Sequence, residues 1–319
     1  MTYSWTPLHA QIHKTIRHRN LLQKNQSILI AVSGGQDSLC LAQLMIDLRS
    51  RWNWQLAIAH CDHRWRSDSQ ENAHHVATLA EKWDLPFHLR VADSTLESEA
   101  AAREWRYAQL RSIEGFSSIA TGHTASDRAE TLLFNLIRGS GADGLRSLNW
   151  TRSLSPTQTL VRPLLELTRA QTGEFCRDRN LQIWEDSTNS DLTYSRNRIR
   201  QELIPYLKTY NPQVEQHLSQ TIELLSADVD YLEGAASELY EQANSSNGLD
   251  RRILKQAAIA LQRRVIRQFL ARSLNFSPNF EQVEKCVALI TAPNRSRTDP
   301  FVGTTIAEVA GDFIQLRSL

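Results

Sequence analysis

A glycine-containing turn between an apolar segment and a helical pattern is the first feature of this sequence that could do chemistry. Residues 27–32, SILIAV, are short, apolar and β-branched like a buried strand, and 39–48, LCLAQLMIDL, have a helical pattern. The turn between them consists of Ser33, Gly34, Gly35, Gln36, Asp37 and Ser38. A turn that leads into a helix N-terminus presents free backbone N–H groups and the positive end of the helix dipole. The turn therefore predicts an anion site, and phosphate is the usual occupant.

The composition of this turn narrows the kind of phosphate ligand. The GxxxxGK[ST] pattern of a Walker A loop is missing, and with it the lysine that grips a γ-phosphate. Gly34 and Gly35 permit close approach of the backbone to phosphate, and Ser33 and Ser38 can donate hydroxyl groups. A carboxylate repels polyphosphate unless Mg²⁺ lies between them, so Asp37 favours ATP with Mg²⁺ and is the expected metal ligand. The alternative is an ordinary strand–helix turn in which Ser and Asp cap the helix.

A second polar cluster follows the predicted strand 55–62. Its residues are His60, Cys61, Asp62, His63 and Arg64. The His-x-Asp-His spacing allows a metal site, although no further ligands are evident in the sequence. We favour contacts to a nucleotide from His60 and Asp62, and a polar loop at a strand end is the alternative.

A third group lies on the predicted helix 98–113. Glu99, Arg103 and Arg106 are spaced i, i+4 and i+7, so they share one helix face. A fixed guanidinium on that face could stabilise charge that develops on a phosphate. The alternative is a surface ion pair between Glu99 and Arg103.

The segment 121–145 begins where another predicted strand, 117–123, ends. Thr124 and Asp127 resemble a capping box with Asp in place of Glu, and Asp127 and Glu130 lie at i and i+3 on one helix face. The two carboxylates either compensate the helix dipole or bind a cationic substrate such as an amino-acid ammonium group. The residues alone leave both interpretations open.

The last polar group is rich in arginine. Residues 184–189, WEDSTN, precede Arg196, Arg198 and Arg200, which are two residues apart. These guanidinium groups could reach phosphates of RNA or of ATP, and a solvated basic turn is the alternative.

The elements that must position these groups alternate between strand and helix. The strands expected at 27–32, 55–62, 86–92 and 117–123 are separated by helical patterns, which predicts an α/β fold with a doubly wound parallel sheet. Ligands bind such a sheet at the carboxyl ends of its strands, and most of the polar groups above follow a strand. We expect a catalytic domain over 1–208 and a smaller, mainly α-helical domain over 209–319.

The second half of the chain has an unusual distribution of charge. Residues 213–241 form an acidic helical stretch without Lys or Arg, and 251–272 form a basic one without acids. The basic stretch either faces RNA phosphates or neutralises the acidic helix. Between them, 243–250 are expected to be a loop, and 304–316 alternate around Gly311 and Asp312 like a hairpin.

Composition limits the classes of protein that the sequence allows. The net charge is +1 over 319 residues, and no apolar run approaches the roughly 20 residues of a membrane span. The four cysteines are scattered and form no CxxC, which argues against a disulfide scaffold, structural zinc or an iron–sulfur cluster. No secretory signal is visible at the N-terminus, so we expect a cytoplasmic protein.

The turn SGGQDS resembles the loop of the PP-loop ATP pyrophosphatase superfamily, whose members cleave ATP between the α- and β-phosphates and adenylate a substrate oxygen. Taken in order, SGGQDS, HCDHRWR, EAAAREWRY, TGHTASDRAETLLFNLIRGSG, RPLL and EDSTN…YSRNRIR…IP are similar to the motifs of the tRNA(Ile)-lysidine synthetases. The likeness is dense over residues 27 to about 207 and looser beyond, where the chain resembles the short members with one C-terminal domain. The residues Arg64 and Trp65 depart from the family pattern, which has Gly-Leu there.

The resemblance implies a reaction and its substrates. ATP adenylates O2 of the wobble cytidine in the CAU anticodon of tRNA(Ile), L-lysine attacks C2 through its ε-amine, and AMP and pyrophosphate are released. It implies nucleotide contacts from Ser33, Gly34, Gly35, Gln36, Asp37, Ser38, His60, Asp62, Gly122 and His123. The catalytic residues that it implies are Asp37 with Mg²⁺, Arg103 and Arg196 at the phosphate, and Asp127 and Glu130 at the lysine. It is also compatible with a homodimer.

Other members of the superfamily are competing interpretations. A tRNA 2-thiolation enzyme shares the loop and the adenylation but usually brings paired cysteines, which this sequence lacks. A glutamine-dependent ligase would need an amidotransferase domain or partner, and nothing in the chain resembles one. A non-enzymatic nucleotide-binding module would need neither the pair Asp127 and Glu130 nor an RNA-facing domain.

Overall fold

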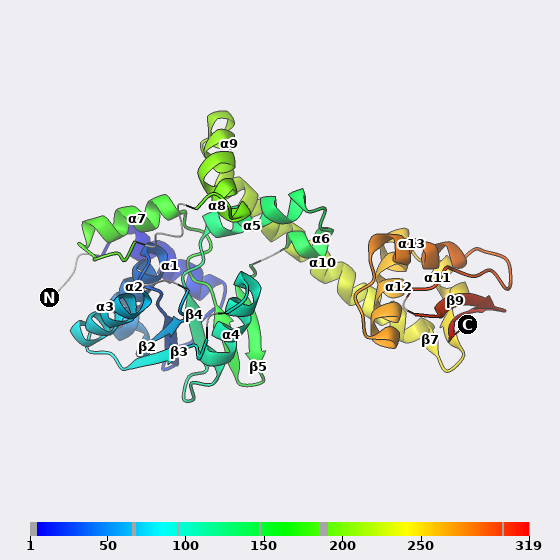
Figure 1. Ribbon diagram of the computed structural model, residues 1–319, viewed down its shortest axis with the longest axis horizontal. Coiled ribbons are helices and arrows are strands. Elements are labelled where there is room, and N and C mark those ends of the chain that lie inside the picture. The colour runs from blue at the N-terminus through cyan, green and yellow to red at the C-terminus, as the bar shows by residue number, and fades with distance from the viewer. Residues whose placement is uncertain are drawn as a thin grey trace. The chain divides into compact units, whose positions relative to one another are not determined.

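The chain folds into two compact units, residues 1–225 and 226–319 (Figure 1). The structure is a computed structural model that describes residues 5–65, 68–94, 96–146, 148–185, 191–301 and 303–318, without the side chain of Glu99. None of the described helices is both long enough and apolar enough to cross a bilayer. The expected functions of two domains, catalysis by residues 1–208 and tRNA binding by residues 209–319, stay a prediction.

A six-stranded sheet in the order β3-β2-β1-β4-β6-β5 forms the centre of the first unit. All neighbouring strands pair in parallel except β5, which is antiparallel to β6. The strands are β1 (Ser27–Ala31), β2 (Gln55–Asp62), β3 (Phe87–Val91), β4 (Ser118–Thr121), β5 (Thr151–Ser155) and β6 (Gln158–Val161). The predicted α/β class with a parallel sheet is confirmed.

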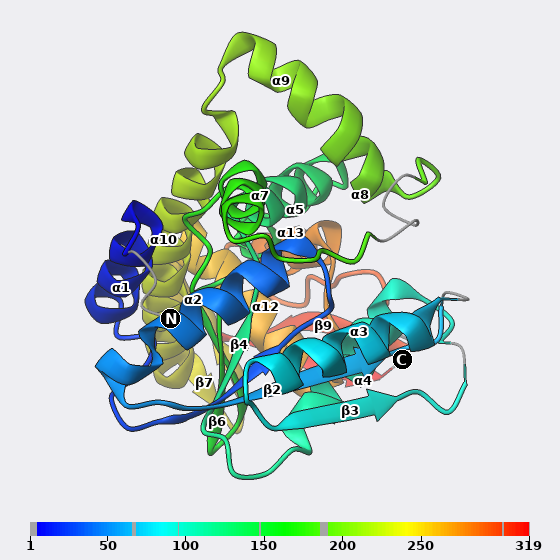
Figure 2. The same cartoon turned by 90° about the vertical axis from the view of Figure 1, so that its left-hand side faces the viewer.

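Helices cover both faces of this sheet (Figures 1 and 2). Side chains alternate along β1, so that Ile28 and Ile30 pack in one core with α1, α2, α3 and α7, and Leu29 packs in another with α4. The helices of this part are α1 (Pro7–His18), α2 (Gln36–Trp52), α3 (Ser69–Lys82), α4 (Glu99–Arg111), α5 (Ala125–Ile137), α6 (Ala142–Leu145) and α7 (Arg169–Asp178).

The strand order locates the position for a ligand. The chain runs outward from β1 through β2 to β3, and then crosses to β4 on the other side of β1. The order therefore reverses between β1 and β4, and α/β sheets bind ligands at the carboxyl ends of strands beside such a reversal. The turn 33–38 follows β1, and residues 122–124 follow β4.

Two strands of this sheet, β5 and β6, had no counterpart among the predicted ones. Of these two strands, β6 pairs with β4, and β5 pairs with β6. The buried side chain of Gln158 on β6 has a partner, since its amide donates to the backbone oxygen of Ile113 at 3.2 Å. A buried glutamine in the short segment 158–161 hides the apolar character by which inner strands are recognised.

A helical segment after residue 194 leads out of the sheet domain. It consists of α8 (Ser195–Arg198), a π-helical turn (Ile199–Leu203) and α9 (Ile204–Tyr210), and Ile199 and Ile204 pack against Ala129 of α5. A π-helical turn inserts an extra residue into a helix and is frequent at functional sites.

The next helix, α10 (Val214–Ala243), is bonded to the sheet domain through its first turns. Glu223 accepts hydrogen bonds from Arg19 of α1, at 2.5 Å, and from Nη1 of Arg128 on α5, at 3.1 Å. It also accepts one from the indole N–H of Trp150 at 2.8 Å. Arg128 is only 2% exposed, so Glu223 provides a counter-charge for a buried guanidinium.

The second unit contains helices and a small antiparallel sheet of order β7-β8-β10-β9. The expected hairpin around Gly311 and Asp312 is confirmed as β9 (Thr305–Ala310) and β10 (Phe313–Ser318). The expectation of a loop over 243–250 is wrong, because β7 (Asn244–Ser245) and β8 (Gly248–Asp250) form a second hairpin there. The helices of this unit besides α10 are α11 (Arg251–Lys255), α12 (Ile259–Leu274) and α13 (Phe280–Leu289).

The basic stretch 251–272 makes ion pairs with neighbouring acids. It forms two helices, α11 and α12, and Arg264 and Arg267 lie 3.0 and 2.5 Å from Oε1 of Glu233 on α10. Arg272 pairs with Glu241 of the same helix at 3.1 Å, so the acidic helix is a partner of this stretch. Contacts of the stretch with RNA stay a prediction.

Candidate active site at the carboxyl ends of the strands

The turn 33–38 is held closed by hydrogen bonds between its own residues. The Ser33 N–H donates to Oγ of Ser38 at 3.1 Å, and this hydroxyl donates to the Gly35 carbonyl at 2.8 Å. Gly34 has a φ of +87°, and a Cβ on it would overlap Oδ1 of Asn72. Asn72 in turn donates to the Ser33 carbonyl at 3.0 Å, so α3 supports the turn from behind. Gly35 is the N-cap of α2, as an anion-binding turn requires.

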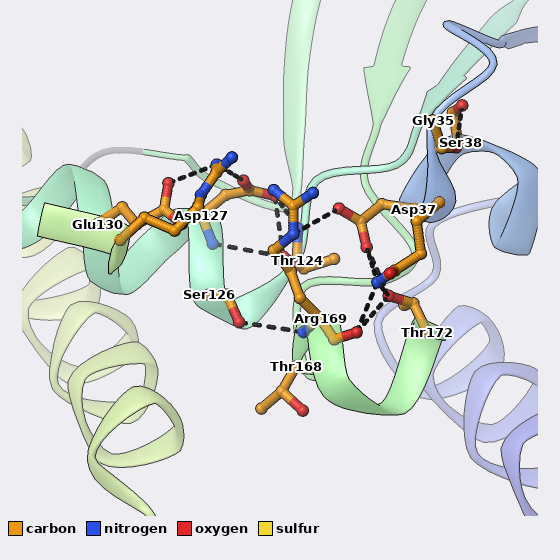
Figure 3. A network of polar contacts seen from close by, with 12 residues as sticks. Gly35, Asp37, Ser38, Thr124, Ser126, Asp127, Glu130, Thr168, Arg169 and Thr172 are labelled. Atoms are coloured by element: carbon orange, nitrogen blue, oxygen red, sulfur yellow. Dashed lines mark hydrogen bonds and ion pairs between the residues drawn. The ribbon is translucent and has the colours of Figure 1, made fainter. Parts of the chain in front are cut away.

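The side chains of Gln36 and Asp37 connect this turn to α7. Gln36 donates to the Arg169 carbonyl at 2.6 Å and to the Thr172 hydroxyl at 2.8 Å. A Cβ on Gly173 would lie only 2.9 Å from the Gln36 amide oxygen, so a larger residue there would displace the Gln36 side chain. Asp37 accepts a hydrogen bond from the Thr172 hydroxyl at 2.5 Å, and its other oxygen lies 3.4 Å from Nε of Arg169 (Figure 3).

The end of β2 contributes a histidine and an aspartate with defined partners. His60 is 3% exposed, and its Nδ1 lies 2.7 Å from the Val32 carbonyl at the end of β1. Asp62 accepts the backbone N–H of Arg64 at 2.8 Å and the Ser69 hydroxyl at 3.2 Å, so it shapes the loop that follows β2.

The end of β4 approaches the first turn of α2 closely. A Cβ on Gly122 would lie 2.8 Å from the Asp37 carbonyl oxygen, so only glycine fits there. Nδ1 of His123 lies 3.0 Å from the Thr121 hydroxyl. Burial lowers the pKa of His123 to about 3, against the opposing charge of Asp127, so its imidazole is neutral at physiological pH.

The two carboxylates of α5 share one guanidinium. The predicted capping box is confirmed, since the Thr124 hydroxyl accepts the Asp127 N–H and Asp127 accepts the Thr124 N–H. Nε and Nη2 of Arg200 donate to Oε1 and Oε2 of Glu130 at 2.6 and 2.8 Å. Nη2 also lies 3.7 Å from Oδ1 of Asp127. In Figure 3, Arg169 lies between Asp37 and these two carboxylates.

The arginines of α8 and the π-helical turn differ in direction. Arg196 lies within 3.5 Å of the Thr131 hydroxyl on α5, and Arg200 contacts Glu130, so both reach the site. Arg198 has a side chain that is 64% exposed and pairs with Glu202. Residues 186–190, which include most of the EDSTN motif, lie outside the described part of the chain.

A group of arginines surrounds the phenol of Tyr107 on α4. The guanidinium carbons of Arg103 and Arg106 both lie 5.7 Å from its ring centroid. Burial would raise the pKa of Tyr107, but the charges of Arg103 and its neighbours Arg162 and Arg106 outweigh burial and lower it. Glu99 begins this helix, and its side chain lies outside the described part of the structure.

Two adjoining cavities collect most of the expected site residues. The larger, about 1020 Å³, is lined by Ser33, Gly35, Gln36, Asp37, Ser38, His60, Asp62, Gly122, His123 and Asp127, among others. The smaller, about 230 Å³, is lined by His63, Trp65, Ala102, Arg103, Arg106, His123, Asp127, Glu130, Thr131, Leu148, Arg196 and Arg200. The cavities share His63, Arg106, His123, Asp127 and Arg200, so a ligand can extend from one into the other. Gly34 lies in the same turn but is not a lining residue of either.

Burial shifts the acid–base properties of two carboxyl groups in these cavities. It raises the pKa of Asp37, and the charge of Arg169 opposes the shift. It also raises the pKa of Glu130, against the hydrogen bonds and charge of Arg200. Both groups therefore accept a proton more readily than an exposed carboxylate does.

Several residues of the site were missed by the sequence reasoning. Arg169 and Thr172 contact Asp37, and the signal for them was the helix start that follows the RPLL motif. Arg200 was recognised as a basic residue but not as the partner of Glu130. Its spacing of four from Arg196 could have placed both on one helix face.

Comparison with known proteins agrees with this geometry. The family model of the PP-loop domain matches residues 6–207. The tRNA(Ile)-lysidine synthase of Nostoc sp. is 57% identical, and that of Synechocystis sp. is 51% identical, each over 98% of both chains. A solved structure, the U34-tRNA thiolase NcsA from Methanococcus maripaludis with its [4Fe-4S] cluster, matches 69% of this chain and 78% of its own, with a TM-score of 0.57 and 16% identity.

These comparisons differ in what they establish. The likeness to the thiolase at 16% identity extends to the fold alone. The two synthases match 98% of the chain at 57% and 51% identity, and the family model of the PP-loop domain spans the sheet and the turn after β1. The chain therefore belongs to the tRNA(Ile)-lysidine synthase family.

Proposed function

We propose that this protein uses ATP to join L-lysine to C2 of the wobble cytidine in the CAU anticodon of tRNA(Ile). The observation that carries the proposal is the junction of two cavities with different chemistry. One contains a turn suited to phosphate, and the other contains a carboxylate pair among arginines. Adenylation of cytidine O2 and attack by an amine on C2 need these two environments side by side.

The larger cavity is the proposed site of ATP. Backbone N–H groups of the turn 33–38 and the first turn of α2 would bind the pyrophosphate that leaves. Ser33 and Ser38 would donate hydroxyl groups, and Gly34, Gly35 and Gln36 keep the turn in its shape. His60, Asp62, Gly122 and His123 would contact the nucleoside from the ends of β2 and β4.

Asp37 fits the role of a Mg²⁺ ligand. Mg²⁺ in ATP sites is bound by one or two carboxylates together with phosphate oxygens and water, so a large cluster of protein ligands is not required. The Asp37 carboxylate lines the larger cavity, while Thr172 and Arg169 hold it from the side of α7. Bound there, Mg²⁺ would neutralise charge on the leaving pyrophosphate.

The arginines of the smaller cavity are suited to stabilising the negative charge that develops on a phosphate in a transition state. Arg103 on α4 and Arg196 on α8 reach it from different elements. We propose that both stabilise the charge that develops on the α-phosphate during adenylation and hold the adenylate afterwards. Because they are attached to separate helices, they can contact the group from two sides.

Asp127 and Glu130 are the proposed binding groups for lysine. A carboxylate pair attracts an ammonium group, and the ε-amine must lose a proton before it can attack C2. Burial raises the pKa of Glu130 despite its hydrogen bonds from Arg200, which favours Glu130 as the acceptor of that proton. Arg200 now occupies both oxygens of Glu130, so the substrate amine would have to share or replace this partner.

Other properties stay predictions under this proposal. The tRNA would bind through the second unit, and the target base would leave the anticodon stack to enter the site, as bases in single-stranded loops can. A cytoplasmic location is expected because no secretory signal is visible in the sequence, and a homodimer is expected from the family resemblance.

Incorporation of radiolabelled lysine into tRNA tests the proposal directly. The purified protein is incubated with ATP, Mg²⁺ and labelled lysine, with and without the isoleucine tRNA that carries CAU. Acid-stable label in that tRNA alone is the expected result. No label, together with ATP–pyrophosphate exchange that depends on RNA, would leave adenylation standing and reject lysine as the nucleophile.

A further inference from the structure

The loop after β2 contains a residue whose function is not explained by ATP or lysine binding. Trp65 lies in the loop that follows β2, next to Arg64. Its side chain lines the smaller cavity, together with Arg103, Arg196 and the two carboxylates of α5. The indole N–H already donates to the Leu96 carbonyl at 2.9 Å, so the surface that Trp65 can offer to a ligand is the face of an aromatic ring.

The backbone of the loop directs this indole toward the cavity. Arg64 has a φ of +57°, a left-handed conformation that a residue with a Cβ adopts only at a cost. The Arg64 N–H is fixed by the hydrogen bond to Asp62 at 2.8 Å. His63 and Trp65 consequently line the smaller cavity, whereas Arg64 lines a separate cavity of about 820 Å³ beside α3 and β3.

The orientation of the indole is also fixed from the far side. Nε1 of Trp65 donates to the Leu96 carbonyl at 2.9 Å, so its only polar atom is satisfied by the protein. The ring centroids of Trp65 and His63 are 4.9 Å apart and their planes are tilted by 40°. Trp65 nevertheless stays 38% exposed, so part of its apolar surface can accept a ligand.

We infer that Trp65 is a stacking platform for the target pyrimidine as it enters the smaller cavity. This inference rests on the proposed function, because it takes the reacting group to be a base of RNA. Stacking between an aromatic side chain and an unstacked base stabilises binding without using the hydrogen-bonding edge of the base. The O2 and C2 atoms of the cytosine stay free to face Arg103, Arg196 and Glu130. Trp65 is thus a positioning residue, not a catalytic one.

A second aromatic ligand, the adenine of ATP, would meet the same surface, and the experiment separates the two. Trp65→Ala, Trp65→Leu and Trp65→Phe are compared with the wild type for binding of the full-length tRNA at one salt concentration. Lysine incorporation gives KM for tRNA and KM for ATP in the same proteins. Trp5→Ala is the matched control, because Trp5 is 47% exposed, lies 5.6 Å from the His9 ring, and belongs to neither cavity of the site.

The expected result is a loss in tRNA affinity of about tenfold for Trp65→Ala and Trp65→Leu, with Trp65→Phe close to wild type. KM for ATP is expected to stay unchanged, and so is every property of Trp5→Ala. A tRNA that lacks the base at the wobble position should bind the wild type about tenfold more weakly and lose nothing further with Trp65→Ala, because the platform then has nothing to stack on.

Three outcomes would overturn the inference. Leucine has no aromatic face, so equal tRNA affinity of Trp65→Leu and the wild type would reject stacking. A change in KM for ATP alone assigns the indole to adenine. If Trp65→Phe and Trp65→Ala lose the same affinity for the tRNA without the base, Trp65 only supports the loop through its hydrogen bond to Leu96. If the wild type binds tRNA but incorporates no lysine, the proposed function fails, and the binding data still decide on Trp65.

Discussion

Arg200 donates two hydrogen bonds to the buried carboxylate of Glu130, at 2.6 and 2.8 Å, and also lies 3.7 Å from Asp127. One guanidinium from the π-helical turn is thus shared by the two carboxylates of α5. The pair therefore connects the proposed lysine site to the segment that leads toward α9. Because Arg200 occupies both oxygens of Glu130, it affects the stability of the fold and the access of a substrate ammonium group to this carboxylate.

Arg200→Ala is expected to lower the free energy of unfolding by about 3 kcal/mol, because it leaves a buried carboxylate without its counter-charge. Urea denaturation at neutral pH measures the change. Arg198→Ala is the matched control, since its side chain is 64% exposed and forms an exposed pair with Glu202, and we expect less than about 0.5 kcal/mol for it. Equal changes in the two variants would contradict a stabilising role of the Glu130 pair.

Glu130→Gln is expected to raise KM for lysine by roughly tenfold or more, since a charge-assisted hydrogen bond to an ammonium group is lost. KM for ATP should change much less. Steady-state kinetics with labelled lysine measure both constants. Glu202→Gln changes an exposed carboxylate of the nearby π-helical turn and should leave both unchanged. A parallel rise in both constants for Glu130→Gln would mean that Glu130 supports the site only structurally.

Asp37→Ala is expected to abolish turnover while the protein stays folded, because the proposed Mg²⁺ site loses its protein carboxylate. The rate of ATP–pyrophosphate exchange in the presence of tRNA measures the loss, and circular dichroism checks the fold. Exchange near the wild-type rate would remove Asp37 from the site.

Gly34→Ala and Gly115→Ala form a pair that isolates the shape of the turn. Both glycines have nearly the same φ, +87° and +88°, but a Cβ at position 34 meets Asn72 whereas nothing lies within 4 Å at position 115. Gly115→Ala should cost only the conformational strain, about 1 kcal/mol, and keep ATP affinity. Gly34→Ala should cost more and weaken ATP binding, as calorimetry on the two variants would show. Similar ATP affinities would argue against the turn as the phosphate site.

The lowered pKa of His123 predicts a loss of stability in acid. Its pKa is about 3 in the folded protein and near 6.5 when unfolded, so between these values the unfolded chain binds one more proton. This contribution to stability is therefore complete above pH 6.5 and falls as the pH decreases, by up to about 1.4 kcal/mol per pH unit. Urea denaturation at pH 7 and pH 5 should show a smaller decrease for His123→Gln than for the wild type. The exposed His74 serves as the control, and His74→Gln should keep the wild-type dependence.

Arg272→Glu should destabilise the second unit by up to about 1 kcal/mol, since it places two acids together, and Glu241→Arg in the same chain should restore the loss. The salt dependence of tRNA binding is measured alongside. Restored stability with wild-type tRNA affinity in the double variant would limit the role of this arginine to the ion pair. Restored stability with weakened binding would add an RNA contact to it.

The sequence was informative where one residue pattern has one structural solution. SILIAV followed by two glycines gives a strand, a turn and a helix start, and Thr124 with Asp127 gives a capping box, because these interactions are local. Asn247 and Gly248 are a common hairpin signal, so a hairpin could have been predicted here, but in another register, because Ser245 pairs with Gly248 and the two loop residues are Ser246 and Asn247.

The contacts that no local pattern determines were the ones missed. Arg169 reaches Asp37 across 132 positions of sequence, and Arg200 reaches Glu130 across 70. Arg196 and Arg200 are four residues apart and both contact α5, but that this face meets α5 depends on how the segment after residue 194 packs there. Such contacts follow from how helices pack, and a single sequence does not record that.

The bond network of Glu223 sets a lower limit on any fragment of this protein that could work alone. Cutting the chain after residue 207, where the family model ends, would remove the acceptor shared by Arg19, Arg128 and Trp150 and take the counter-charge of Glu223 from the buried Arg128 guanidinium. A minimal catalytic fragment should therefore include the first three turns of α10, through residue 225, whatever becomes of the helix beyond them.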